Sequence, residues 1–167
     1  VVELDVNDEA SVERCFASIE SSGEKVDILI NNAGIERRGS VEKCPIPTFE
    51  EVMNTNYLGP IRCIQAALPN MKESGTGLIV NITSVAGKVA ASPLAPYTAS
   101  KFALEALSEC LAQEVLPKPI THDQIRGAVG NDEGHHLYSQ HPWSGKARAC
   151  HWNSPSTLLA CSTHGRS

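Results

Sequence analysis

Apolar residues follow two spacings along the first part of this 167-residue chain. Residues 1–6 and 26–30 are short, mostly aliphatic runs of strand length. The apolar positions between them recur at the spacing of one helix face: Val12, Cys15, Phe16 and Ile19. Asn7 or Asp8 can cap this helix and Gly23 can end it. The order strand, helix, strand predicts a parallel sheet, because parallel neighbours need a crossover connection.

A longer helix is predicted to begin at Thr48 and to end between Pro69 and Gly75. Thr48 and Glu51 form the Thr-x-x-Glu pattern of a capping box, in which each side chain satisfies a backbone amide. Pro60 lies inside this helix and, having no N–H, cannot donate to the carbonyl of Asn56 four residues earlier. Two interpretations stay open: a bend without chemical role, and an opening that frees the Asn56 carbonyl.

Residues 77–84 (GLIVNITS) predict a buried strand, because four of them are aliphatic and glycines flank the run. Ser84 therefore falls at the carboxyl end of a strand, where open α/β sheets place their ligands. A third helix is predicted over residues 97–116, between prolines on either side. Tyr97 and Lys101 then lie one turn apart on one face of that helix.

Tyr97 and Lys101 form a candidate proton-transfer pair. Positions i and i+4 of a helix lie about 5–6 Å apart, so the ammonium of Lys101 is expected to lower the pKa of Tyr97. A phenol that ordinarily titrates near pH 10 would then act as an acid or base near neutrality. Taken alone, a Tyr-x-x-x-Lys match is weak, since the alternative is a surface tyrosine with a solvated lysine one turn on.

Further segments accompany this pair in a fixed order. They are Asp5 and Val6 in VVELDV, the NNAG segment at residues 31–34, Asn56 in NTNYLG, and Ser84 thirteen residues before the tyrosine. The set resembles the short-chain dehydrogenase/reductase family, in its single-domain branch, over residues 1–116. The resemblance implies an α/β fold with a doubly wound, Rossmann-like parallel sheet. It also implies an oxidoreductase that uses NAD or NADP to interconvert a secondary alcohol and a ketone or aldehyde by hydride transfer.

The resemblance implies a role for each of four residues. Tyr97 would be the general acid/base, and Lys101 would lower its pKa and hold the nicotinamide ribose. Ser84 would hydrogen-bond the substrate oxygen, where negative charge develops. Asn56 would hold, through its backbone carbonyl, a water that links the lysine to solvent.

The implied cofactor contacts come from seven residues: Asp5, Val6, Asn32, Ala33, Gly34, Tyr97 and Lys101. Asp5 would accept from the adenine amine, and Asn32 would lie near the adenosine ribose. Asn31 is expected to tie neighbouring strands together. Without the accompanying family motifs, Asp5 would be interpreted as a surface acid at a strand end, and Asn31 with Asn32 as a pair of turn residues.

Both ends of the chain depart from the family pattern. The chain opens at what resembles the third strand, so the expected sheet lacks its first two strands, the glycine-rich pyrophosphate turn and the residue that selects between NAD and NADP. Residues 118–167 hold all six histidines and both tryptophans, and no aliphatic run of strand length. We therefore expect a partial Rossmann domain over residues 1–117 and an irregular, poorly ordered tail over residues 118–167. The alternative function is a non-catalytic fragment or isoform that cannot bind dinucleotide.

The net charge and the length of the apolar runs limit which kinds of binding partner and cellular location are expected. A net charge of -5 gives no electrostatic case for nucleic acid. No apolar run reaches membrane-spanning length and no leader opens the chain, which predicts a cytoplasmic location. The resemblance implies a small, hydrophobic alcohol or carbonyl substrate, and a homo-oligomer formed through the second and third helices.

The six cysteines contain no Cys-x-x-Cys pair and are predicted to be free thiols. Soft and imidazole ligands gather near the carboxyl end: Cys150, His151, Cys161 and His164. Their spacing does not match a common zinc site, so no metal is predicted.

Overall fold

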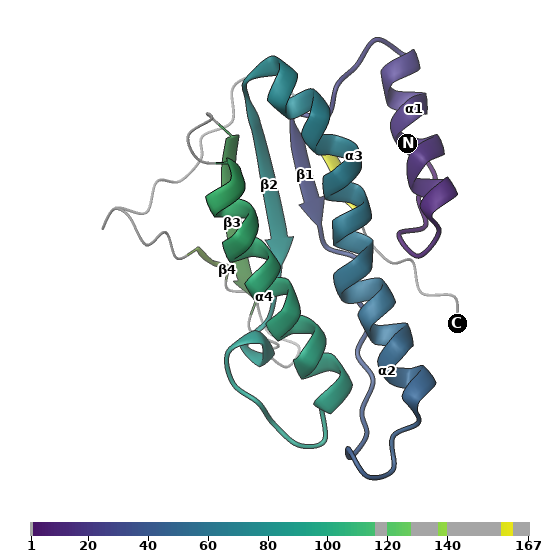
Figure 1. The fold of residues 1–167 in the computed structure, drawn as a ribbon, viewed down its shortest axis with the longest axis vertical. Helices are drawn as coiled ribbons and strands as arrows, with labels where there is room; N and C mark the ends of the chain where they lie inside the picture. Colours follow the sequence, from purple (N-terminus) through teal and green to yellow (C-terminus); the bar gives the residue numbers. More distant parts are fainter. Residues whose placement is uncertain (1, 116–119, 128–136, 140–157, 162–167) are drawn as a thin grey trace.

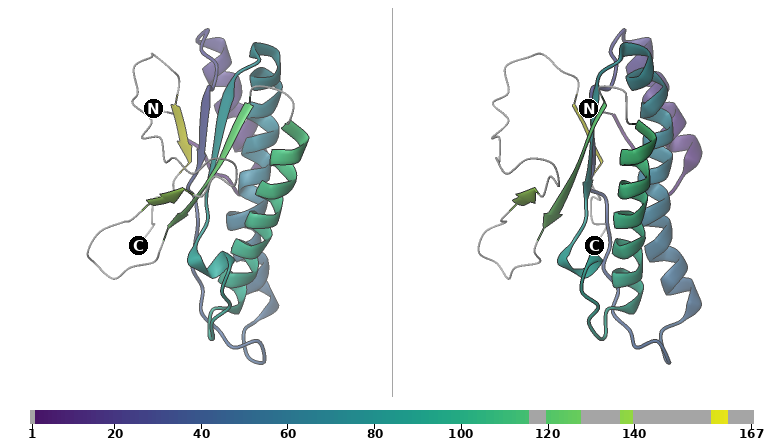
Figure 2. Two further views of the ribbon diagram at one scale, coloured as in Figure 1. Left: turned by 90° about the vertical axis from the view of Figure 1, so that its left-hand side faces the viewer. Right: turned by 60° about the vertical axis from the view of Figure 1, so that its left-hand side comes forward.

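The computed structural model describes residues 2–115, 120–127, 137–139 and 158–161. In this part of the chain, five strands form one sheet of order β4-β3-β2-β1-β5, and the α-helices all lie on one of its faces (Figure 1, Figure 2). The strands are β1 (Ile28–Asn31), β2 (Gly77–Ile82), β3 (Ile120–Gly127), β4 (Leu137–Ser139) and β5 (Leu158–Cys161). All pairs are parallel except β3 with β4.

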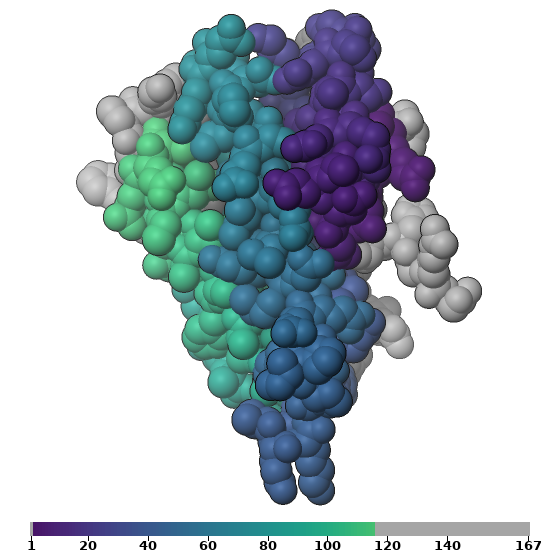
Figure 3. Space-filling view, turned by 45° about the vertical axis from the view of Figure 1, so that its right-hand side comes forward, coloured from purple at the N-terminus to yellow at the C-terminus, as the bar shows by residue number. Residues whose placement is uncertain are grey.

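Helices alternate with the strands β1, β2 and β3 along the chain, which confirms the predicted α/β order. They are α1 (Glu9–Ser21), α2 (Ile46–Met53), the π-helix η1 (Asn54–Leu58), α3 (Gly59–Ser74), the 3-10 turn η2 (Val85–Gly87) and α4 (Ala95–Val115). Figure 3 shows α1, α3 and α4 side by side on the helical face. A doubly wound sheet carries helices on both faces, and the described residues supply those of one face.

The predicted start and end of α1 are confirmed. The Asp8 side chain accepts a hydrogen bond of 3.1 Å from the backbone N–H of Ala10 and so satisfies a donor that the first turn leaves unpaired. Gly23 follows the helix with φ of 81°, a conformation that glycine adopts without strain.

The predicted capping box at Thr48 is wrong, because α2 begins two residues earlier, at Ile46. Pro47 lies in the first turn, where its fixed φ suits a helix start and its missing N–H has no partner to lose. Glu51 forms a salt bridge of 2.8 Å with Arg37 instead of returning to the helix start.

The break predicted around Pro60 takes the form of a widened turn. The helix passes from α2 into the π-helical η1 and then into α3, and the Gly59 N–H bonds the carbonyl of Asn54, five residues earlier. Pro60 lies in the first turn of α3, so the proline sits where a new helical register begins. Single π-helical turns inside helices recur at functional sites, and this one contains Asn56.

Two expectations about strands are wrong. Residues 2–6 form no strand, although their composition is aliphatic. The segment after residue 117 was expected to form none, yet β3 pairs with β2 and β5 pairs with β1. Local composition is a weak guide here, because the open backbone edges of two buried strands supply hydrogen-bond partners whatever the side chains are. The rest of the expected tail lies outside the described residues.

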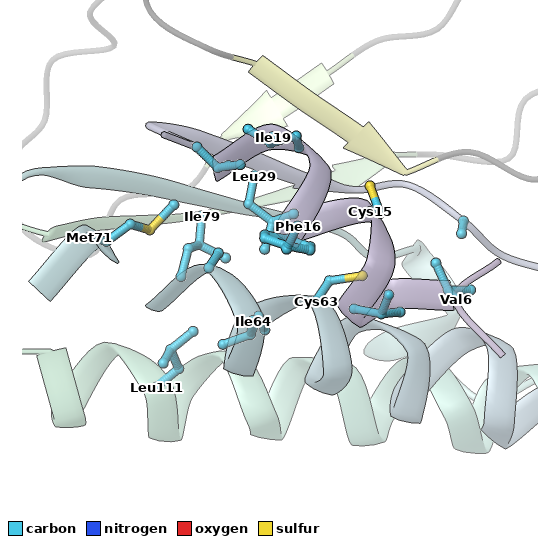
Figure 4. Packing of buried hydrophobic residues seen from close by; sticks show 14 of the residues in the cluster. Val6, Cys15, Phe16, Ile19, Leu29, Cys63, Ile64, Met71, Ile79 and Leu111 are labelled. Atoms are coloured by element: carbon cyan, nitrogen blue, oxygen red, sulfur yellow. The ribbon is translucent and has the colours of Figure 1, made fainter. Parts of the chain in front are cut away.

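The hydrophobic core lies between α1, α3 and the central strands (Figure 4). Leu29 of β1 and Ile79 of β2 are fully buried under the helices. Cys15 and Cys63 are also buried there. Neither of them forms a disulfide, and the same holds for the partly buried Cys44 and the exposed Cys110. Burial raises the pKa of the Cys15 thiol, which keeps it protonated and apolar.

A chain of polar side chains crosses this core. Asn31 of β1 donates to Asn81 of β2 at 2.8 Å, as its expected role between strands required. Asn81 donates in turn to Ser108 of α4 at 2.8 Å, and Ser108 donates to the backbone carbonyl of Leu104 at 2.7 Å. Asn81 and Ser108 are 0% exposed, so these bonds fix the register of α4 on the sheet.

Candidate active site

Three of the predicted residues converge where β2 ends. Ser84 lies two residues beyond β2, is 2% exposed, and caps η2 by accepting from the Ala86 N–H at 3.2 Å. Tyr97 lies in the first turn of α4 and Lys101 one turn later. The Ser84 hydroxyl approaches Tyr97 closely enough to act on the pKa of its phenol. The spacing of thirteen residues therefore brings a strand end and a helix start together.

The pKa of Tyr97 is raised above its ordinary value, chiefly because burial disfavours the phenolate. The Ser84 hydroxyl acts in the opposite direction, and the charge of Glu36 adds to the rise. The expectation that Lys101 lowers this pKa is wrong for this structure, since burial prevails. Tyr97 is thus a protonated phenol near neutral pH, ready to donate.

Lys101 is a buried cation, 5% exposed. Its Nζ donates to the backbone carbonyl of Ile82 at 2.9 Å and lies 5.7 Å from the centre of the Tyr97 ring. Burial lowers the pKa of Lys101 from 10.5 to about 8. The ammonium is therefore mostly charged at pH 7 and loses that charge at moderately alkaline pH.

Asn56 is fully buried and uses its whole side chain in hydrogen bonds. Its Oδ1 accepts from the Ile35 N–H at 2.8 Å, and its Nδ2 donates to the Ile35 carbonyl and to Ser100 Oγ, each at 2.9 Å. The side chain thus has a structural task, and the predicted contact with a relay water would fall to the backbone carbonyl, to which Pro60 cannot donate.

The NNAG segment lies against Asn56 and Lys101. Within it, Ala33 is buried, Asn32 is exposed and Gly34 is partly buried. A Cβ on Gly34 would lie 3.4 Å from Asn56 Oδ1 and 3.7 Å from Lys101 Nζ. The absence of a side chain at Gly34 therefore leaves space beside the ammonium, as the predicted approach of a cofactor needs.

Asp5 and Val6 lie in the segment that precedes α1. The exposed Asp5 carboxylate accepts from the Asn7 N–H at 2.9 Å and keeps further acceptor capacity. Val6 is buried in the core, and its carbonyl accepts from Arg62 at 3.0 Å. Gly59 fits tightly here, because a Cβ on it would meet Val6 Cγ2 at 2.9 Å.

A buried acid that was not predicted lies behind this site. Glu105 of α4 is 3% exposed and forms a salt bridge of 3.1 Å with Lys88, which follows η2. A Cβ on Gly87 would lie 3.0 Å from Glu105 Cγ, so η2 packs closely on α4. The salt bridge holds the segment after Ser84 to the helix that carries Tyr97. The i, i+4 spacing of Lys101 and Glu105 is the sequence signal that places the acid on the same helix face.

A family model described as short chain dehydrogenase matches residues 1–129, most of the chain. This chain belongs to the short-chain dehydrogenase family. The sheet has the α/β, Rossmann-like architecture of that family, whose members are oxidoreductases that use NAD or NADP.

Named relatives share the family and differ in substrate. Dehydrogenase/reductase SDR family member 7B of Danio rerio is 40% identical over 114 residues, which cover 68% of this chain and 37% of the relative. Retinol dehydrogenase 8 of Bos taurus is 39% identical over 116 residues, 70% of this chain and 36% of the relative. The chain thus spans little more than a third of the length of these short-chain dehydrogenases.

A solved short-chain dehydrogenase supports the fold. The gluconate 5-dehydrogenase of Burkholderia cenocepacia, in complex with NADP and tartrate, is 30% identical with a TM-score of 0.72, over 75% of this chain and 49% of that one.

Among the residues that our structure describes, no helix is long and apolar enough to cross a membrane. Nor do these residues include a group of three or more side chains that could hold a metal ion. The side chains of the cysteines and histidines considered as zinc ligands near the carboxyl end are not described.

Proposed function

We propose that this chain carries the proton-transfer site of an NAD(P)-dependent oxidoreductase that interconverts an alcohol and its carbonyl compound. The approach of the Ser84 hydroxyl to Tyr97 supports the proposal, together with the buried ammonium of Lys101, whose Nζ lies 5.7 Å from the centre of the tyrosine ring, because two hydroxyl donors and a cation then lie near one strand end. In the reductive direction, Tyr97 gives its proton to the carbonyl oxygen as negative charge develops there. Ser84 donates a hydrogen bond to the same oxygen.

The residues present fit the nicotinamide end of the cofactor. Lys101 has three N–H donors, one of which bonds the Ile82 carbonyl, and Gly34 leaves room beside the ammonium. Lys101 would hold the hydroxyls of the nicotinamide ribose. Asp5, with Asn32, would meet the adenosine part. When bound, the nicotinamide supplies or accepts the hydride.

The raised pKa of Tyr97 keeps the phenol protonated near neutral pH, which is the form that donates in carbonyl reduction. We propose a small and hydrophobic substrate. The exposed apolar side chains of Val85 and Val89, in the segment that follows Ser84, support an apolar substrate surface.

The test separates this function from the alternative of a non-catalytic isoform. The full-length product of the gene is titrated with NADH and NADPH by fluorescence, and its turnover is measured with a panel of ketones and aldehydes. Binding together with turnover that Ser84→Ala lowers supports the proposal. No binding of either dinucleotide supports the non-catalytic alternative and contradicts the proposal. Binding without turnover on any carbonyl also contradicts the proposal.

A further inference from the structure

Ser100 lies at a junction of three segments of the site. It is 0% exposed and stands between Tyr97 and Lys101 in α4. Its hydroxyl donates to the backbone carbonyl of Tyr97 at 2.7 Å and accepts from Asn56 Nδ2 at 2.9 Å. One side chain therefore joins the turn of α4 that carries the acid/base to the π-helix η1.

The rest of the Asn56 amide is held by a different segment. Its Oδ1 and its other N–H bond the backbone of Ile35, in the loop that follows β1. Loop, η1 and α4 thus meet on one amide group, and Ser100 is the member that belongs to α4. Because a buried amide without its partner is costly, these bonds restrain one another.

We infer that Ser100 is a positioning residue for proton transfer. It fixes the distance between η1 and the helical turn that presents Tyr97 and Lys101, and it acts through Asn56 without touching substrate. This inference rests on the proposed function, since it assigns Ser100 a share in the same reaction. Without the hydroxyl, α4 keeps its packing on the sheet but its first turns lose their tie to η1, and a displacement of about 1 Å can cost roughly 100-fold in rate.

The same helix offers a matched control two turns away. Ser108 is also 0% exposed, also accepts from an asparagine amide, that of Asn81 at 2.8 Å, and also donates to a backbone carbonyl, that of Leu104 at 2.7 Å. Ser100→Ala and Ser108→Ala remove the same atoms and the same two kinds of hydrogen bond. They differ in whether the asparagine belongs to η1 or to the sheet.

The two variants are made in the full-length product of the gene and compared by melting temperature and steady-state kinetics. We expect similar losses of melting temperature. Ser100→Ala should lower kcat by about tenfold to 100-fold with a nearly unchanged KM for the dinucleotide, and Ser108→Ala should leave kcat within about twofold of the parent. Ser100→Thr, which keeps the hydroxyl, should recover most of kcat if its melting temperature matches the parent.

Equal kcat in the two alanine variants, whether both unchanged or both lowered, would overturn the inference. A Ser100→Thr variant that is stable but as slow as Ser100→Ala would overturn it as well. Should the threonine destabilise the protein, the comparison of the two alanine variants still decides. Tyr97→Phe, measured in parallel, tests the proposed function separately: if it loses turnover while Ser100→Ala does not, only the inference about Ser100 fails.

Discussion

The replacement Lys101→Met tests the buried cation through stability. Burial lowers the pKa of Lys101 from 10.5 to about 8, which corresponds to a cost of about 3 kcal/mol for keeping the charged form in the folded state. This cost is fully present below pH 8, where folded and unfolded chains are both protonated. It disappears above pH 10.5, where both are neutral. Methionine has a similar length and no charge, so the variant should gain stability over the parent at pH 7.

The measurement is urea unfolding of parent and variant at a series of pH values from 7 to 11. We expect the difference in unfolding free energy, variant minus parent, to fall by about 3 kcal/mol across this range, most of it between pH 8 and 10.5. The change with pH is the informative quantity, because the packing difference between methionine and lysine is the same at every pH. Lys72→Met, on the exposed side of α3, serves as control for the loss of a lysine as such.

A difference that stays constant from pH 7 to 11 would refute the reasoning. It would mean that the ammonium of Lys101 is as well solvated in the folded chain as in the unfolded one. The bond to Ile82 and the burial of the side chain would then have no electrostatic consequence.

Two further predictions concern the charge of Lys101 and the buried hydrogen bonds of Asn81. Dinucleotide affinity should fall as pH rises through about 8, because Lys101 loses the charge with which it holds the ribose; fluorescence titration checks this, and affinity constant to pH 10 would contradict it. Asn81→Ala should lower the unfolding free energy by about 2 kcal/mol, because Asn31 and Ser108 lose a buried partner; urea unfolding checks this, and a loss as small as that of a surface substitution would contradict it.

The sequence predicted those parts of the fold that local patterns control. The cap at Asp8, the buried strand that leads to Ser84 and the helix that carries Tyr97 all follow from periodicity and turn chemistry. The meeting of Ser84 with Tyr97 was inferred from a family resemblance, because thirteen residues of spacing alone do not specify a contact between a strand end and a helix.

Features that depend on tertiary context were not predicted. Strand β3 forms on the edge of β2 although its sequence is largely polar, and residues 2–6 form none although theirs is aliphatic. The pKa of Tyr97 depends on the balance between burial and charge, which helical spacing does not reveal. The bonds of Ser100 to Asn56 also join residues 44 positions apart, and nothing local in the sequence marks that pair.

Single-turnover hydride transfer by Tyr97→Phe tests the central claim most directly. The full-length product of the gene is mixed with saturating reduced cofactor and a carbonyl substrate, with Tyr57→Phe as control. We predict that Tyr97→Phe binds the cofactor as the parent does and transfers hydride about 100-fold to 10,000-fold more slowly, while Tyr57→Phe keeps the parent's rate. Hydride transfer by Tyr97→Phe at the parent's rate would show that another group supplies the proton.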